Sequence, residues 1–193
     1  MPSTEPQSPS NLKDRPTLET ARLILRPCRM DDAADIKRLA GDRDIARNTM
    51  LIPHPYEHGE AERWIGTHQE NYESGQGVTF GIERRQDGSF LGTIGLTIFE
   101  KHKTAELGYW IGKPYWNNGY CTEASNALLQ YGFEIRQLHR IHAKCYSRNP
   151  ASGRVMQKIG MQHEGTLREH ILKWDVHEDV EVYGILRHEF FKE

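Results

Sequence analysis

A loop of turn-forming residues over 113–120 is the part of the chain best suited to bind a ligand. It follows a strand-like segment that ends at Gly112 and precedes a helix expected to begin near Thr122. The loop brings free backbone N–H groups and the positive end of a helix dipole to one point, where they can hold a phosphate group. Gly119 lets the backbone approach that phosphate and permits a positive φ. Neither G-x-G-x-x-G nor a Gly-rich loop ending in Gly-Lys-Ser/Thr occurs in this segment, so we expect a phosphate from another kind of cofactor.

The segment resembles the acetyl-coenzyme A pyrophosphate loop of the GNAT superfamily of N-acetyltransferases. Within that superfamily it is similar to the ribosomal-protein N-terminal alanine/serine acetyltransferases (Rim type). The loop reads Arg/Gln-x-x-Gly-x-Gly/Ala in the wider family and Trp116-x-x-Gly119-x-Cys121 here, where Cys121 replaces the usual small residue. The resemblance implies that acetyl-coenzyme A is the co-substrate and that its pyrophosphate contacts Trp116, Asn117, Asn118, Gly119, Tyr120, Cys121 and Thr122.

The resemblance also implies a place for the pantetheine arm of the cofactor. In the family this arm lies beside the fourth strand and makes sheet-like hydrogen bonds, and the matching backbone here is Trp110, Ile111 and Gly112. The amide of Ile111 is the expected donor to the oxyanion, and Asn149 is expected to hold the pantetheine amides. The alternative for Gly112 is that it only ends a strand.

Acetyl transfer to an amine needs a group that removes a proton from the amine. Glu106 resembles the glutamate often found on the strand beside the thioester, which acts directly or through water. A partly dry cleft raises the pKa of a glutamate and lets it accept a proton near neutrality. The alternative is a strand carboxylate paired with a surface Lys or Arg. His170 is a second candidate base.

The leaving thiolate also needs a partner. Many relatives place a tyrosine there, but the corresponding position is Met156, which cannot donate a proton. The run Asn149-Pro150-Ala151-Ser152 is similar to the Asn-x-x-Ser of the ribosomal-protein branch, whose serine is proposed to meet the coenzyme sulfur. Ser152 is therefore expected to hydrogen-bond the thiolate. Helix capping is the alternative for both polar residues, and it is compatible with cofactor contact.

Composition limits the classes of function. The chain has 193 residues, and its formal net charge of −2 argues against nucleic acid as a partner. It contains no apolar run near the ~20 residues that a membrane helix needs, and no signal-peptide core at its N-terminus. Three cysteines cannot form a complete disulfide set, so we expect a reducing, cytoplasmic location. The pair His139-x-x-His142 lacks further ligands, so no metal site is expected.

Hydrophobic periodicity indicates one mixed α/β domain over residues 17–193, after a flexible Pro-rich leader over residues 1–16. The fold expected is the GNAT fold, with a mixed, mostly antiparallel central sheet flanked by helices. The pattern predicts strands near residues 23–26, 78–82, 90–99, 105–111, 141–145, 163–171 and 179–187, and helices near 33–40, 61–72, 122–131 and 150–159.

These features together predict an N-acetyltransferase that moves an acetyl group from acetyl-coenzyme A to a primary amine, most simply a protein N-terminal α-amine. The alternatives are a small-molecule amine (an antibiotic, a polyamine or an amino-acid-like amine) and a catalytically silent acyl-coenzyme A sensor. The acceptor depends on segments 49–56 and 172–178, where Asp175, Glu178 and Asp179 either attract a cationic acceptor or are only solvated. A monomer and a homodimer both remain open.

Overall fold

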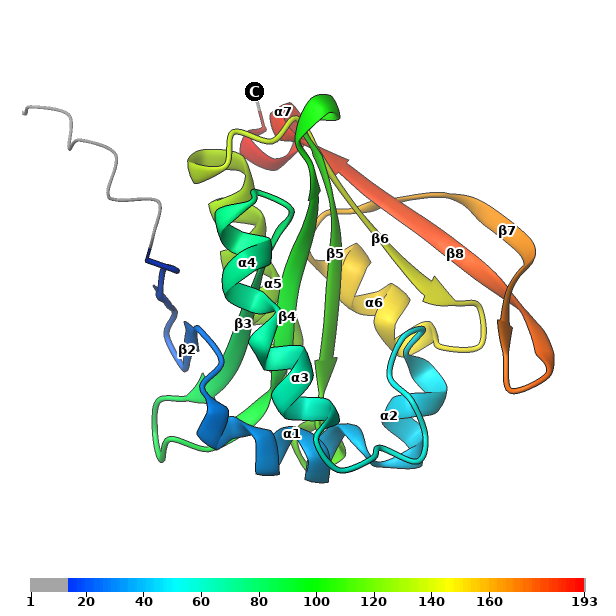
Figure 1. The fold of residues 1–193 in the computed structure, drawn as a ribbon. Coiled ribbons are helices and arrows are strands. Elements are labelled where there is room, and N and C mark those ends of the chain that lie inside the picture. The colour runs from blue at the N-terminus through cyan, green and yellow to red at the C-terminus, as the bar shows by residue number, and fades with distance from the viewer. Residues whose placement is uncertain (1–13, 193) are drawn as a thin grey trace, which may run out of the picture.

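The computed structural model describes residues 14–192, so the leader expected over residues 1–16 lies outside them except for its last three residues. Within this part of the chain, eight strands form one sheet in the spatial order β1-β2-β3-β4-β5-β6-β8-β7 (Figure 1). All neighbouring strands are antiparallel except β5 and β6. The expected mixed, mostly antiparallel sheet is therefore confirmed. The strands are β1 Leu18–Glu19, β2 Leu23–Arg26, β3 Gly77–Arg84, β4 Phe90–Phe99, β5 Thr104–Ile111, β6 Arg140–Tyr146, β7 Gln162–Lys173 and β8 Val176–Leu186.

Helices cover both faces of this sheet (Figure 1). They are α1 Ala33–Ala40, α2 Arg43–Asn48, α3 Glu60–Gly66, α4 His68–Glu73, α5 Tyr120–Gln130, α6 Pro150–Lys158 and α7 Arg187–Phe191. Short 3₁₀ turns lie at Met30–Asp32, Glu100–His102 and Lys113–Tyr115, and a π-helical turn at Tyr131–Ile135 continues α5.

Two apolar clusters hold the layers together, one on each face. The larger cluster joins the sheet to α5 and α6, and Leu107 of β5 belongs to it. The smaller cluster joins α1, α2 and α3 to Phe90 and Trp110. Because side chains alternate across a strand, Leu107 and Trp110 serve opposite faces. The second face is covered around Trp110, whereas Gly108, two residues earlier on that face, is exposed.

Most predicted elements are present, and the differences have local causes. The helix expected over 61–72 is divided at Thr67 into α3 and α4. Helix α2 was not predicted because six residues are too few to show a periodic pattern, although Asp42 caps it by accepting from the N–H of Asp44 at 2.8 Å. Strand β1 and helix α7 are also short and were missed. Helix α5 begins at Tyr120, two residues before the predicted start.

The expected loop over 172–178 is instead the tip of a long hairpin. Strands β7 and β8 run to Lys173 and from Val176, so only two residues connect them. These residues, Trp174 and Asp175, have φ values of 51° and 62°. Two positive φ values in a two-residue hairpin turn match the right-handed twist of the flanking strands. The tip is therefore a defined structural element.

Candidate active site

Strands β5 and β6 pair at one end and then separate (Figure 1). Their pairing runs from Thr104 with Arg140 to Leu107 with Ala143, and no later residues pair. The Gly112 N–H donates to the carbonyl of Leu91 on β4 at 2.8 Å. Hydrogen bonding alternates along an antiparallel strand, so the N–H groups of the odd-numbered residues that precede it point away from β4. The gap between β5 and β6 is therefore lined by backbone donors of β5.

Among the three residues predicted to contact pantetheine, the structure gives this orientation to Ile111 alone. Its N–H points toward the gap, while that of Trp110 points toward β4. The carbonyl of Gly112 accepts from the Tyr115 N–H at 2.9 Å, so both backbone groups of Gly112 have partners in the protein. A Cβ at Gly112 would come within 2.7 Å of the Leu39 side chain. Gly112 therefore packs directly against α1. The backbone donor that is available to pantetheine or the thioester is the amide of Ile111.

The loop after β5 leads into the N-terminus of α5. Gly119 is the N-cap, with φ of 77°, and no side chain caps this helix. The N–H groups of the first turn therefore remain open to a ligand. Trp116 fixes the loop to the strand by donating its indole N–H to the Ile111 carbonyl at 2.6 Å. Asn118 stabilises it internally, because its Nδ2 donates to the carbonyls of Tyr115 and Trp116 at 3.2 and 2.9 Å.

Arg22 was missed by the sequence analysis although it shapes this loop. Its Nη1 donates to the carbonyl of Asn118 at 3.0 Å, and its Nε lies 2.7 Å from a carboxylate oxygen of Glu123. It also lies over the Tyr120 ring, 4.8 Å from the centroid. Nothing in the local sequence indicates these contacts, since Arg22 is about a hundred residues earlier in the chain. Arg22, directly before β2, therefore holds this loop in place.

The remaining residues of this segment lie in the turn before α5 and in its first helical turn. Asn117 has φ of 63°, which lets the chain turn toward the helix, and Thr122 lies in the first turn of α5. Cys121 packs beside the larger core cluster, and burial raises the pKa of its thiol to about 12. Cys121 is therefore a neutral packing residue.

Ser152 lies in the first turn of α6. Asn149 caps this helix by accepting from the Ser152 N–H at 3.3 Å, and Pro150 occupies the first helical position. The Ser152 Oγ lies 2.9 Å from the hydroxyl of Tyr109, which also donates to the Ser152 carbonyl at 3.1 Å. Burial raises the pKa of Tyr109 far above its usual value, so the phenol keeps its proton. Met156, the position where relatives carry a tyrosine, is buried in the larger core cluster.

Tyr109 is a second residue that the sequence analysis missed. It lies on β5 beyond the last residue that pairs with β6, and its hydroxyl meets Ser152 across the gap. The alternation that places Leu107 in the larger cluster also places Tyr109 on that face, so the side of the strand was predictable. Its contact with α6 depends on how the strands separate.

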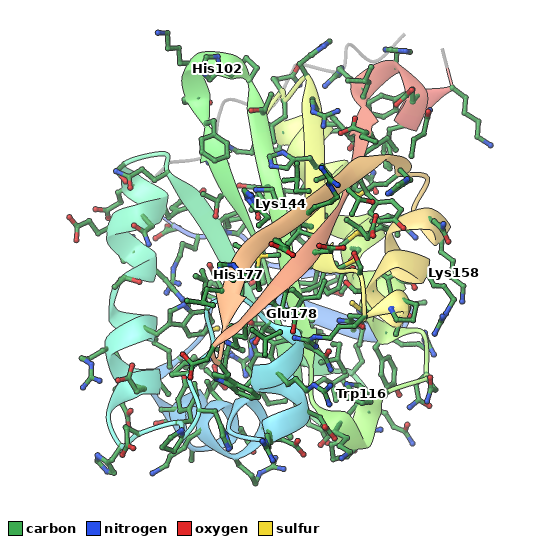
Figure 2. The ribbon with its side chains drawn as sticks, turned by 90° about the vertical axis from the view of Figure 1, so that its right-hand side faces the viewer. His102, Trp116, Lys144, Lys158, His177 and Glu178 are labelled. Atoms are coloured by element: carbon green, nitrogen blue, oxygen red, sulfur yellow. The ribbon has the colours of Figure 1, made fainter. Side chains whose placement is uncertain are left out.

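Glu106 lies on the opposite face of β5, beside two cationic or basic side chains of β6. Its Oε2 is 2.9 Å from the Nζ of Lys144, which is labelled in Figure 2, and 3.3 Å from His142 Nε2. The side chains of His142 and Lys144 hold the pKa of Glu106 down to about 2, although its partial burial acts in the opposite direction. The expectation of a raised pKa is therefore wrong. His170, the other candidate base, is exposed on β7.

The face that carries Glu106 also has open space. Gly108 is exposed, and a Cβ built there would meet no atom within 4 Å. The two segments expected to select the acceptor, 49–56 and 172–178, contact each other at the tip of the hairpin β7–β8. Lys173 at the hairpin tip donates to the Ile52 carbonyl at 3.1 Å, and the rings of Trp174 and His54 are 5.9 Å apart. Segment 49–56 and the hairpin tip therefore form one wall.

Two of the three acidic residues near this wall are bound within the protein. Glu178 lies 2.7 Å from Arg148 Nε, and Asp179 accepts from the Glu169 N–H at 2.7 Å. Arg148 also donates to Asn48 at 3.0 Å, which ties the end of β6 to α2. Asp175 is exposed at the hairpin turn. Of the three acids expected either to attract a cationic acceptor or to be only solvated, Glu178 is thus in an ion pair and Asp179 in a hydrogen bond within the protein.

Two further findings concern residues 14–192 only. No three His, Cys, Asp or Glu side chains in this range gather as a metal site would require. Over the same range, every helix is too short or too polar to cross a membrane. His142 contacts Glu106, and His139 instead uses its backbone, with its N–H donating to the Lys103 carbonyl at 2.7 Å.

Residues 22–162 match the family model described as an acetyltransferase (GNAT) domain. The chain belongs to the GNAT acetyltransferase family. An uncharacterized N-acetyltransferase of Bacillus subtilis (strain 168), YoaA, is 35% identical over 173 residues, covering 89% of this chain and 97% of the relative. A ribosomal-protein-serine acetyltransferase of Escherichia coli (strain K12) is 30% identical over 100 residues, covering 51% and 56%. The solved structure of spermidine N-acetyltransferase from Vibrio cholerae, in complex with CoA and spermine, has the same fold, with a TM-score of 0.77, 24% identity and coverage of 89% and 99%.

Membership makes this GNAT chain an acetyl-coenzyme A-dependent N-acetyltransferase. Its structure fits the co-substrate in two respects. The N-terminus of α5 has no side-chain cap, which suits an anionic pyrophosphate, and the gap beyond Leu107 presents backbone donors, which suit the amides of pantetheine. The thioester supplies an activated acetyl group, while the protein supplies orientation and hydrogen bonds.

Proposed function

We propose that this GNAT chain acetylates the α-amine of a protein N-terminus, as an enzyme acting on a ribosomal protein would. The observation that carries the proposal is the wall formed by segment 49–56 and the hairpin tip. Lys173 donates to the Ile52 carbonyl at 3.1 Å and so holds segment 49–56 against the hairpin tip, and we assign an extended peptide to the surface that they form together. The likeness of about half the chain to a ribosomal-protein-serine acetyltransferase supports the same class of acceptor.

The charges on this side of the sheet disfavour a polyamine. Glu178 and Glu106 are each paired with a cation, and Lys144 and Arg148 supply those cations. A polyamine needs several free carboxylates to balance its charges, whereas a peptide N-terminus brings a single amine. An acceptor with one amine and a polar backbone therefore matches the wall better.

The proposal assigns a task to each part of the site. The first turn of α5 and the loop Trp116–Thr122 hold the pyrophosphate. The N–H of Ile111 faces the thioester oxygen, where a preorganised donor stabilises the charge that develops during attack. Asn149 holds the pantetheine amides, and Ser152, supported by Tyr109, hydrogen-bonds the departing sulfur. Glu106 lies on the acceptor face. The three cysteines are unpaired, which suits the cytoplasm, where ribosomal proteins are made.

A panel of acceptors tests the proposed function. The purified protein is given acetyl-coenzyme A with peptides that begin in Ser, Ala or Met, with the same peptides blocked at the N-terminus, and with spermine and an aminoglycoside. Release of coenzyme A and peptide mass are measured. We expect turnover of free peptides and none of blocked ones. Turnover of spermine or the aminoglycoside alone would overturn the assignment, and tight cofactor binding with no acceptor at all would indicate a sensor.

A further inference from the structure

The sheet carries a histidine–carboxylate pair on the face where the acceptor enters. His142 and Glu106 are paired positions of the parallel strands β6 and β5, and His142 Nε2 lies 3.3 Å from Glu106 Oε2. The His142 ring stacks on Phe99 of β4, with centroids 6.4 Å apart and planes inclined by 23°. The imidazole is therefore oriented from two sides, with its second nitrogen, Nδ1, directed away from the carboxylate.

The pair stands where the gap between β5 and β6 begins. The strands pair for one residue beyond it, at Leu107 and Ala143, and then separate. Gly108 follows on β5, and the space over it is open. The proposed function assigns this face to the acceptor, and so brings the amine over this open space, next to His142 and Glu106. Only 18% of the His142 side chain is exposed, so it lies in the floor of this approach.

Glu106 itself is poorly suited to take a proton. Lys144 and His142 share its Oε2 and stabilise the ionised form, so the pKa of Glu106 is near 2. A carboxylate with so low a proton affinity is a weak base toward an amine. It is, however, well suited to accept a hydrogen bond from an imidazole N–H and to stabilise an imidazolium, as the aspartate of a Ser-His-Asp triad does.

We propose that His142 is the base that removes the proton from the acceptor amine, and that Glu106 is the residue that positions it. This rests on the proposed transfer of acetyl to an amine. The neutral amine attacks the thioester carbonyl, and a C–N bond forms. Water in the open space over Gly108 relays one proton from that nitrogen to His142 Nδ1, while Nε2–H faces Glu106. The C–S bond breaks, its electron pair leaves with sulfur as the thiolate, and Ser152 hydrogen-bonds that thiolate. The proton on His142 passes to solvent when the products leave.

The charges around His142 come from three strands. Glu106 of β5 and Lys144 of β6 are of opposite sign and paired with each other. Arg140 of β6 is paired with Glu164 of β7. Each of these two cations is thus paired with a carboxylate of a neighbouring strand.

The first test is a spectroscopic one that needs no acceptor. Spectra of ¹⁵N-histidine-labelled protein are compared for wild type, His142→Gln and Glu106→Leu, and the signal missing in His142→Gln identifies His142. We expect the Nε2-protonated tautomer in wild type and a mixture of tautomers in Glu106→Leu. The same tautomer population in both proteins would overturn the positioning role of Glu106, whatever the acceptor is.

The second test is kinetic and uses the peptide that wild type turns over best. We expect His142→Gln to lose about 10²-fold in kcat, with the acid-side fall of the pH profile removed and coenzyme A affinity unchanged. Glu106→Leu should lose less, about tenfold. The matched control is His163→Gln, since His163 also faces a carboxylate, Glu181, at 2.6 Å, but on the hairpin β7–β8. It should keep wild-type rates. A larger loss in Glu106→Leu than in His142→Gln would show that Glu106 is the base and overturn the proposal.

Discussion

Substitution of Gly119 by alanine separates the needs of the fold from those of the cofactor. Gly119 has φ of 77° and ψ of 2°, a left-handed conformation that costs an L-residue about 1–2 kcal/mol. The nearest atom to an added Cβ is Arg22 Nη2 at 3.5 Å, an ordinary contact, so the surrounding protein accepts the methyl group. The methyl group lies beside the N–H groups that we propose hold the pyrophosphate. We therefore expect two separate effects.

The first effect is on stability and the second on affinity. For a chain of this size a loss of about 1 kcal/mol lowers Tm by about 2–4 °C. Displacing the pyrophosphate from its backbone donors should weaken acetyl-coenzyme A binding by tenfold or more, which corresponds to about 1.4 kcal/mol. A thermal melt without ligand measures the first effect, and titration calorimetry well below Tm measures the second.

Gly75→Ala provides the matched control. Gly75 has φ of 74°, and a Cβ there would meet only Arg136 Nη2 at 3.9 Å, so the backbone cost is the same. Gly75 precedes β3, at the end of the sheet opposite to the loop after β5. We expect Gly75→Ala to lose stability and keep its affinity. Wild-type affinity in Gly119→Ala, or an equal loss of affinity in Gly75→Ala, would refute the placement of the pyrophosphate.

Three further predictions concern other parts of the molecule. Ser152→Ala should lower kcat about tenfold to a hundredfold, since one charge-assisted hydrogen bond contributes roughly 1.5–3 kcal/mol. Tm should stay nearly constant because Asn149 still caps α6, and an unchanged rate with a lowered Tm would limit Ser152 to a structural role. Asp32→Asn removes the charged partner of the buried Arg26 in two contacts of 2.8 Å, while Arg26 keeps Glu83 at 2.6 Å. It should cost about 1.5–3 kcal/mol in urea unfolding without changing acetyl-coenzyme A affinity, and a cost below about 0.5 kcal/mol would contradict this. The folded pKa of Glu106, about 2, lies below its unfolded value near 4.3, so its stabilising contribution is complete above about pH 4.5 and is lost as pH falls toward 2. Wild type should therefore lose stability relative to Glu106→Gln between pH 6 and pH 3, and parallel plots of unfolding free energy against pH for the two proteins would refute the pairing.

Much of the fold and part of the site follow from the sequence because they depend on neighbours in the chain. Strand alternation and helical spacing predicted the main strands of the sheet and the helices on both faces. The turn to α5 depends on Gly119, and the cap of α6 on Asn149 and Pro150, all within a few residues of the helices they begin. The signal failed for short elements such as α2, whose six residues show no period.

Tertiary structure alone decided the electrostatics and the assembly of the site. Glu106 has a lowered pKa because a parallel strand 38 residues later places Lys144 beside it, and the charge of a distant strand has no local signature. Tyr109 reaches Ser152 across 43 residues only because β5 and β6 separate after Leu107. Lys173 meets Ile52 across 121 residues because the hairpin β7–β8 extends to segment 49–56. The types of the side chains near the gap between β5 and β6 are known from the sequence. Their partners, and hence their chemistry, depend on strand register and on where the two strands separate.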